Sequence, residues 1–191
     1  MKQTFLALLL VFAAMLSGCL MVSLHPFYSK GDIIEDSQLV GIWQEDGKDI
    51  IWLFQQDEDK KTYAITITEG DGLTGLFIGT PFKINNELFV DIYPGTQNDD
   101  ALKMTDAYKL HRIPAHSLIH VKKSNRSSIL RVPSFPWFTE HLESHPKALK
   151  HEIIDDNFPV LTATTKELQA FWFKHLETED AYIETKLVKQ P

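Results

Sequence analysis

The sequence predicts a mainly β domain in which an antiparallel meander of eight to nine short strands closes into a barrel or folds into a sandwich. Three observations support this fold class. Short apolar segments recur at hairpin spacing from residue 39 onward, polar turn residues separate them, and no long helical pattern lies between them. Strands joined by hairpins pair antiparallel, and a sheet of this many strands buries its apolar face by closing or doubling over.

The alternation of side chains identifies individual strands. Tyr63, Ile65 and Ile67 alternate with small or polar residues, which is the pattern of a strand buried on one face. Pro81 cannot donate a ladder hydrogen bond, so it predicts a bulge or a sheet edge. Glycine, asparagine and aspartate are frequent between the strands and suit tight hairpin turns. After a first strand that begins near residue 39, further strands are expected at 50–54, 63–67, 76–84, 87–92, 108–113, 117–122, 128–132 and 181–188.

Two helices interrupt this β pattern, one near residues 135–145 and one near 164–177. Thr164 and Glu167 have the spacing of a capping box, which predicts that the second helix begins there. The apolar face of this helix recurs with helical periodicity at Leu168, Phe171, Trp172, His175 and Leu176. We expect it to lie against the outside of the barrel and to be followed by the last strand.

The first nineteen residues have the layout of a secretory signal peptide with a lipidation site. Lys2 precedes an apolar stretch at 5–15 that is too short to remain as a membrane span. Leu16-Ser17-Gly18-Cys19 follows, and it contains the only cysteine of the chain. This tetrapeptide resembles the bacterial lipobox, in which lipid is attached to the cysteine and the chain is cut before it. An ordinary signal peptide with a chance cysteine is the alternative interpretation.

These features divide the chain into a signal peptide at 1–18, a lipidated N-terminus and tether at 19–36, and a single β-rich domain at 37–191. The tether is apolar or stiff, unlike a flexible linker, so we expect it to pack onto the domain. Removal of residues 1–18 leaves 173 of the 191 residues and changes the net charge from −7 to −8. That length is enough for one core, and the acidic balance argues against nucleic acid as a partner.

No catalytic signature, phosphate loop or dinucleotide fingerprint is present, so we expect no enzymatic activity and no cofactor. His141 and His145 would share a helix face, and His116 and His120 would share a strand face. The first pair is interpreted as surface residues, because no third metal ligand is evident. The second pair is interpreted as part of a half-exposed sheet face. We therefore expect no metal site. With its one cysteine modified, the chain has no disulfide.

Three aromatic residues are the candidates for ligand binding. Trp43, Trp52 and Tyr63 come from three successive strands, so they meet in one place if they face inward. The interior of an eight-stranded barrel is wide enough either to be filled by side chains or to hold one small apolar ligand. Several large aromatic residues in so few strands favour a filled interior.

Two resemblances add to this interpretation. Gly41-Ile42-Trp43 resembles the Gly-x-Trp motif of lipocalins, and Thr105-Asp106-Ala107-Tyr108 is loosely similar to their later Thr-Asp-Tyr motif; this resemblance implies an eight-stranded barrel. A closer resemblance covers nearly the whole mature chain. Residues 24–28, 39–43 and 161–171 are similar to a group of small bacterial lipoproteins, which implies an envelope location and adds no site residue beyond Cys19.

The expected function is that of a membrane-anchored bacterial lipoprotein, held at the membrane through lipid on Cys19, that acts as a non-enzymatic binding or envelope-interaction module. The first alternative is a lipocalin-like carrier of a small hydrophobic ligand. The second is a hydrolase whose histidines and carboxylates are distant in sequence. The residue after Cys19 is Leu20 and not the aspartate that resembles an inner-membrane retention signal. We therefore expect the protein at the periplasmic face of the outer membrane in a Gram-negative host.

Overall fold

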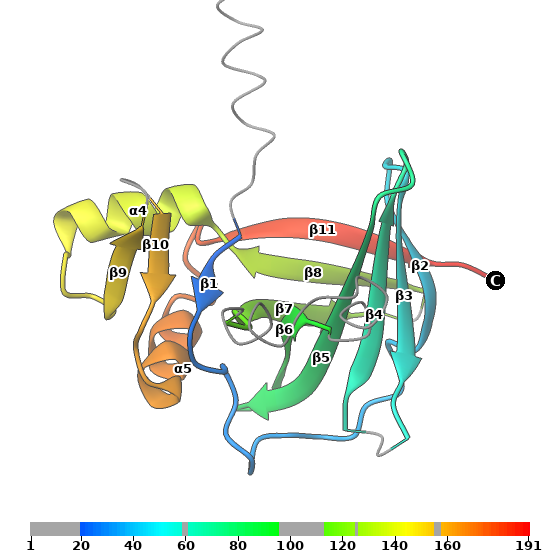
Figure 1. Ribbon diagram of the computed structural model, residues 1–191, viewed down its shortest axis with the longest axis horizontal. Coiled ribbons are helices and arrows are strands. Elements are labelled where there is room, and N and C mark those ends of the chain that lie inside the picture. The colour runs from blue at the N-terminus through cyan, green and yellow to red at the C-terminus, as the bar shows by residue number, and fades with distance from the viewer. Residues whose placement is uncertain (1–19, 59–60, 96–112, 125, 155–157) are drawn as a thin grey trace, which may run out of the picture.

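A computed structural model of the protein describes residues 20–58, 61–95, 113–124, 126–154 and 158–191. Eight antiparallel strands form a closed barrel, in the order β11-β2-β3-β4-β5-β6-β7-β8. A second, three-stranded sheet and two short helices lie beside the barrel (Figure 1). The predicted mainly β barrel is therefore confirmed, and its closed form is consistent with a lipocalin-like barrel.

Seven barrel strands, β2 to β8, each pair antiparallel with the next strand along the chain, and the eighth, β11, closes the ring by pairing antiparallel with both β8 and β2. Residues at several hairpin turns have positive φ, among them Gly47, Gly72 and Asn85, as the turn composition predicts. The expected strand at 108–113 falls almost wholly outside the described residues. The strands are β2 (Gly41–Glu45), β3 (Ile50–Gln56), β4 (Tyr63–Glu69), β5 (Thr74–Ile84), β6 (Glu87–Pro94), β7 (Ser117–Lys123), β8 (Ser127–Pro133) and β11 (Tyr182–Lys189).

The remaining elements form an outer layer on one side of the barrel (Figure 1). Four of them belong to the connection between β8 and β11, and the fifth is contributed by the segment that precedes β2. In the small sheet, β1 runs parallel to β10, which pairs antiparallel with β9. The sequence pattern did not predict this sheet. Its elements and the helices are β1 (Val22–Ser23), α4 (Phe135–Ser144), β9 (His151–Ile154), β10 (Phe158–Leu161) and α5 (Thr165–Lys174).

Both predicted helices are present, and both begin at a capping side chain. The Ser134 hydroxyl accepts a hydrogen bond from the backbone N–H of Trp137 at the start of α4. At the start of α5, Thr164 and Glu167 form the complete capping box that their spacing predicts. Among the described residues, no helix has both the length and the apolar character that crossing a membrane requires.

Two apolar clusters hold the structure together, and the strands β6 and β7 separate them. On β6, Leu88 and Val90 face the barrel interior, whereas Phe89 between them faces the outer layer. The interior cluster contains Leu39, Trp43, Phe54, Tyr63, Ile65, Leu88, Val90, Ile92, Ile119, Val121, Leu130 and Leu187. The outer cluster packs the helices and the small sheet on the barrel, with Phe27, Phe82, Phe89, Phe138, Leu161, Leu168, Phe171, Trp172 and Tyr182 among its members.

The tether is part of the folded domain. Met21 and Phe27 are buried in the outer cluster, and strand β1 lies within the small sheet. Further along, the backbone N–H of Ile34 donates to the carbonyl oxygen of Pro81 at a distance of 3.1 Å. Strand β4 pairs with β5 only as far as Gly79, so Pro81 lies at a local edge that the tether covers. Pro81 thus lies at a sheet edge, as the absence of a backbone N–H on proline predicts.

Candidate functional site

The three aromatic residues proposed for ligand binding lie in the barrel interior. Trp43 and Tyr63 are 2% and 1% exposed, Trp52 is partly buried, and Trp43 and Trp52 are directly paired across β2 and β3. Phe54 packs between two of them, with its ring centroid 6.0 Å from Trp52 and 5.8 Å from Tyr63. The strands thus bring these side chains together as their alternation predicts. Cys19 and the preceding lipobox residues lie outside the described residues.

The polar atoms of these aromatic residues have partners within the protein. Trp43 Nε1 donates to the carbonyl oxygen of Leu39 at 2.6 Å, and Trp52 Nε1 donates to Glu45 Oε1 at 3.0 Å. The Tyr63 hydroxyl donates to the Asp36 carbonyl oxygen. Burial and the nearby Asp36 carboxylate raise the pKa of Tyr63 well above its ordinary value, so the phenol stays neutral. These bonds fix the rings in place as core residues.

A buried carboxylate fastens the tether to the barrel. Asp91, on the outer face of β6, has no solvent exposure. One oxygen accepts a hydrogen bond from the Phe27 backbone N–H at 2.7 Å, and the other lies 2.7 Å from His116 Nδ1. Burial raises the pKa of Asp91, and the bonds to His116 and Phe27 partly oppose this shift. His116 also pairs its backbone with Ser23 in the tether, so this pair holds the two segments together.

His120 corrects one expectation from the sequence. The sequence predicts a half-exposed sheet face at this position, but His120 is fully buried, because the rings of Phe89 on β6 and Tyr182 on β11 pack against it. Its Nε2 lies 2.9 Å from Glu87 Oε2, and its Nδ1 lies 3.3 Å from Arg131 Nη1. Burial lowers the pKa of His120, and the positive charge of Arg131 adds to this effect while Glu87 opposes it. The ring is therefore held neutral within a buried polar network.

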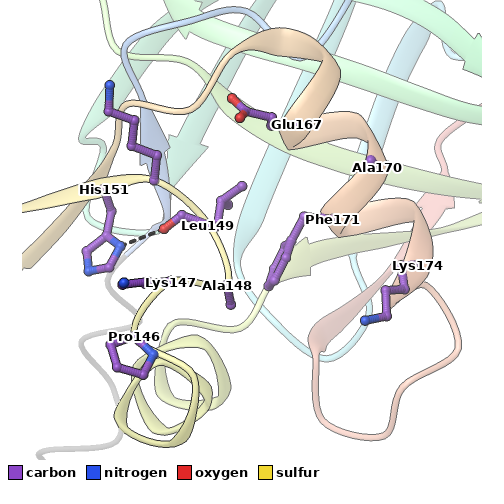
Figure 2. A pocket seen from close by; sticks show the side chains of 10 residues that line it. Pro146, Lys147, Ala148, Leu149, His151, Glu167, Ala170, Phe171 and Lys174 are labelled. Atoms are coloured by element: carbon purple, nitrogen blue, oxygen red, sulfur yellow. Dashed lines mark hydrogen bonds between the residues drawn. The ribbon is translucent and has the colours of Figure 1, made fainter.

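A surface groove lies between α5 and the segment 145–151, which joins α4 to β9 (Figure 2). Two hollows of about 600 and 510 Å³ make up the groove. They are continuous, because both are lined by Pro146, Lys147, Ala148, Phe171 and Lys174. Hollows of this size are typical of sites for small molecules. The groove is outside the barrel and on the outer layer.

The groove has a basic rim and an apolar floor. Lys147, Lys150 and Lys174 line it from the connecting segment and from α5, together with a single carboxylate, Glu167. Within the part of the chain that the structure describes, no carboxylate lies within 4.0 Å of any of the three ammonium groups. The floor consists of Phe171 with neighbouring alanine and leucine side chains.

One end of the groove carries a stack of histidines. The rings of His141 and His145 are stacked with centroids 4.7 Å apart, and His175 lies 5.1 Å from His141. Trp137 packs against both His141 and His175. The described residues contain no group of three or more histidine, cysteine, aspartate or glutamate residues arranged to hold a metal ion. Burial, followed by a neighbouring histidine and then by Lys174, lowers the pKa of His141 and of His175.

Sequence reasoning did not single out the groove lysines. They are spread over residues 147–174, and exposed lysines carry no local signal that distinguishes a site from a solvated surface. The fold defines the class of the protein as a mainly β chain built on a closed eight-stranded antiparallel barrel. No protein family, curated protein or solved structure matches the chain.

Proposed function

We propose that this protein is a lipid-anchored component of the bacterial cell envelope and acts as a non-enzymatic binding module. The lipobox-like Leu16-Ser17-Gly18-Cys19 supports the anchor, because a cysteine that carries several acyl chains binds a membrane stably. The proposal places the protein at the periplasmic face of the outer membrane in a Gram-negative host, since Leu20 follows the cysteine.

The observation that carries the proposal is the incorporation of the tether into the fold. Strand β1 begins at Val22, only three residues after Cys19, and pairs with β10. Asp91 holds the tether again at Phe27. A lipid on Cys19 therefore keeps the domain at the membrane surface with the outer layer on the side of the anchor. Such an arrangement suits a module that meets its ligand at the envelope.

The barrel serves this module as a scaffold. Trp43, Phe54 and Tyr63 are each no more than 2% exposed and occupy the interior from three adjacent strands. Side chains of this size fill the interior of an eight-stranded barrel. Binding then takes place outside the barrel, where the groove beside α5 offers space and charge.

A Cys19→Ser variant tests the anchor. Without the sulfur no lipid can be attached, and we expect uncleaved precursor that takes up no fatty-acid label. The wild-type chain should be labelled and should fractionate with the outer membrane. Labelling of the variant would refute the lipidation site, and recovery of the wild-type chain in the inner membrane would refute the proposed location.

A lipocalin-like carrier is the second candidate, because the barrel has the matching architecture and some interior residues at its wall are only partly buried. These residues are Trp52, Ile67, Phe77 and Val132. Titration of the full-length protein with fatty acids and retinoid-like probes, followed by tryptophan fluorescence, separates the two functions. The binding module predicts no saturable quenching. Saturable micromolar quenching that weakens in a folded Trp43→Ala variant would favour the carrier instead.

A further inference from the structure

We propose that the groove between α5 and residues 145–151 binds a ligand in which a phosphate group is attached to a flat apolar body. This inference deepens the proposed binding function and rests on it, but it does not depend on the lipid anchor. Its basis is the combination of volume, excess positive charge and an aromatic floor in one place.

The charge of the groove is opposite to that of the chain. The protein as a whole has a net charge of −7, yet three lysines and one glutamate line the larger hollow. Oε2 of Glu167 accepts hydrogen bonds from the Thr164 backbone N–H at 2.8 Å and from the Thr164 hydroxyl at 2.7 Å. The charge of Lys150 also acts on this carboxylate, so one carboxylate faces three ammonium groups. The excess of ammonium groups favours an anion in the groove.

A phosphate suits these ammonium groups better than a single carboxylate. Lysine binds phosphate as a point charge with three donors, and a phosphate monoester presents about two negative charges and three oxygens near neutral pH. Lys147 and Lys150 come from the segment after α4, whereas Lys174 comes from the last turn of α5. Figure 2 shows Lys147 and Lys174 on the two walls of the groove. The cations thus come from both walls of the groove.

The apolar floor of the groove is the basis for the flat apolar body of the proposed ligand. Phe171 is 8% exposed and presents this part to the groove beside Ala148 and Ala170 (Figure 2). Its ring is held in place by Trp172 and Phe138, with ring centroids 5.1 and 5.7 Å away. A rigid aromatic floor between small side chains favours a flat apolar group that packs on it. The volume of about 600 Å³ accommodates such a group together with a phosphate.

The experiment uses full-length protein in a non-ionic detergent and three probes: phenyl phosphate, inorganic phosphate and benzyl alcohol. Calorimetry and tryptophan fluorescence report binding, since Trp137 and Trp172 pack against Phe171. We expect phenyl phosphate to bind saturably, inorganic phosphate to bind about tenfold more weakly, and benzyl alcohol not to bind. Equal binding of benzyl alcohol, or no saturable binding of phenyl phosphate, would overturn the proposal.

Two variants of equal net charge provide the control. The groove variant is K147Q/K150Q/K174Q, and the control variant K30Q/K83Q/K122Q removes three exposed lysines elsewhere. We expect the groove variant to lose at least about tenfold in affinity for phenyl phosphate and the control variant to change by less than about twofold. Equal losses would show non-specific attraction and would sink the proposal. Thermal melting of both variants establishes that they remain folded.

Phe171→Leu tests the floor separately. This change keeps an apolar side chain but removes the ring, so we expect weaker binding of phenyl phosphate and unchanged binding of inorganic phosphate. Loss of both would contradict a division of the groove into a charged rim and an aromatic floor. If the Cys19→Ser variant still took up the fatty-acid label, the lipid anchor would be refuted but the binding results for the groove would not change. The two proposals can therefore be refuted independently of each other.

The phosphate group can belong to a soluble molecule or to a lipid headgroup. Micelles that contain phosphatidic acid, compared with micelles that contain phosphatidylcholine, distinguish these sources in competition with phenyl phosphate. Displacement by phosphatidic acid alone supports the site with a lipid headgroup as its ligand. If phenyl phosphate binds saturably and neither lipid displaces it, the result supports a phosphate site whose ligand is a soluble molecule.

Discussion

The two sides of the barrel are built from similar strands but face different surroundings. On the β2–β3 side the outward residues meet solvent, and Ile42 and Ile51 are 45% and 40% exposed. On the β6–β7 side the outer layer covers the strands, and both Asp91 and His120 are fully buried. The comparison shows that an outward-facing residue of this barrel is buried where other segments cover it, as the tether covers Asp91 at Phe27 and the rings of Phe89 and Tyr182 cover His120.

The covered side uses its polar residues to fasten that layer. Asp91 accepts a hydrogen bond from the Phe27 backbone N–H of the tether, and the Tyr182 hydroxyl on β11 donates to the carbonyl oxygen of Trp172 in α5 at 2.8 Å. Buried polar groups are costly unless they are paired, so these contacts favour one position of the layer on the barrel. The open side has no such requirement, and threonines alternate with isoleucines along β4.

The largest expected effects come from removing one aromatic residue from each cluster. Trp43→Ala in the interior and Trp172→Ala in the outer layer should each lower the free energy of unfolding by about 3–5 kcal/mol, because each leaves a large cavity. Urea denaturation followed by circular dichroism and fluorescence measures this loss. A single transition in both variants is expected. A separate early transition in Trp172→Ala alone would show that the outer layer unfolds independently.

Asp91→Ala sharpens the comparison by breaking one bond between barrel and tether. The Phe27 N–H and the His116 ring lose their buried acceptor, so we expect a loss of about 1–3 kcal/mol in the free energy of unfolding and faster proteolysis within residues 20–36. Asp46→Ala is the control, since Asp46 forms an exposed ion pair with Lys186 that contributes at most about 1 kcal/mol. Equal effects of the two changes would contradict the role of Asp91.

His120 makes stability depend on pH. Its folded-state pKa is lowered, mainly by burial, so the neutral ring contributes stability that is fully present above its ordinary pKa of about 6.5. This contribution is lost as the pH falls below that value toward the folded-state pKa. We expect the urea midpoint to decrease between about pH 7.5 and 5.5, and to decrease less in His120→Gln. An unchanged slope in the variant would show that another group dominates.

Thr164→Ala should have the smallest effect. The variant loses the side-chain cap of α5, which typically costs about 1 kcal/mol of stability. Lys166→Ala, on the same helix and exposed, is the matched control and should change stability by no more than about 0.5 kcal/mol. If the two changes are equal within error in thermal melting, the capping box does not stabilise the helix measurably.

Features encoded by neighbouring residues were predictable from the sequence alone. The period-two pattern at 63–67 became β4, and the capping spacing of Thr164 and Glu167 became the start of α5. The positions of the hairpin turns and the pairing of Trp43 with Trp52 were also predictable, because hairpin connections place successive strands side by side. The lipidation site at Cys19 is likewise a prediction of the sequence, and it stays a prediction.

Only the tertiary structure decided what covers the outside of the barrel. The small sheet joins β1 to β10 across more than a hundred residues, and β1 is too short to have a pattern of its own. His120 was misjudged for the same reason, since the residues that bury it come from β11 and β6. The groove lysines line one groove only because α5 packs beside residues 145–151. Local sequence encodes local geometry, whereas burial and a shared site require contacts between surfaces that are distant in the chain.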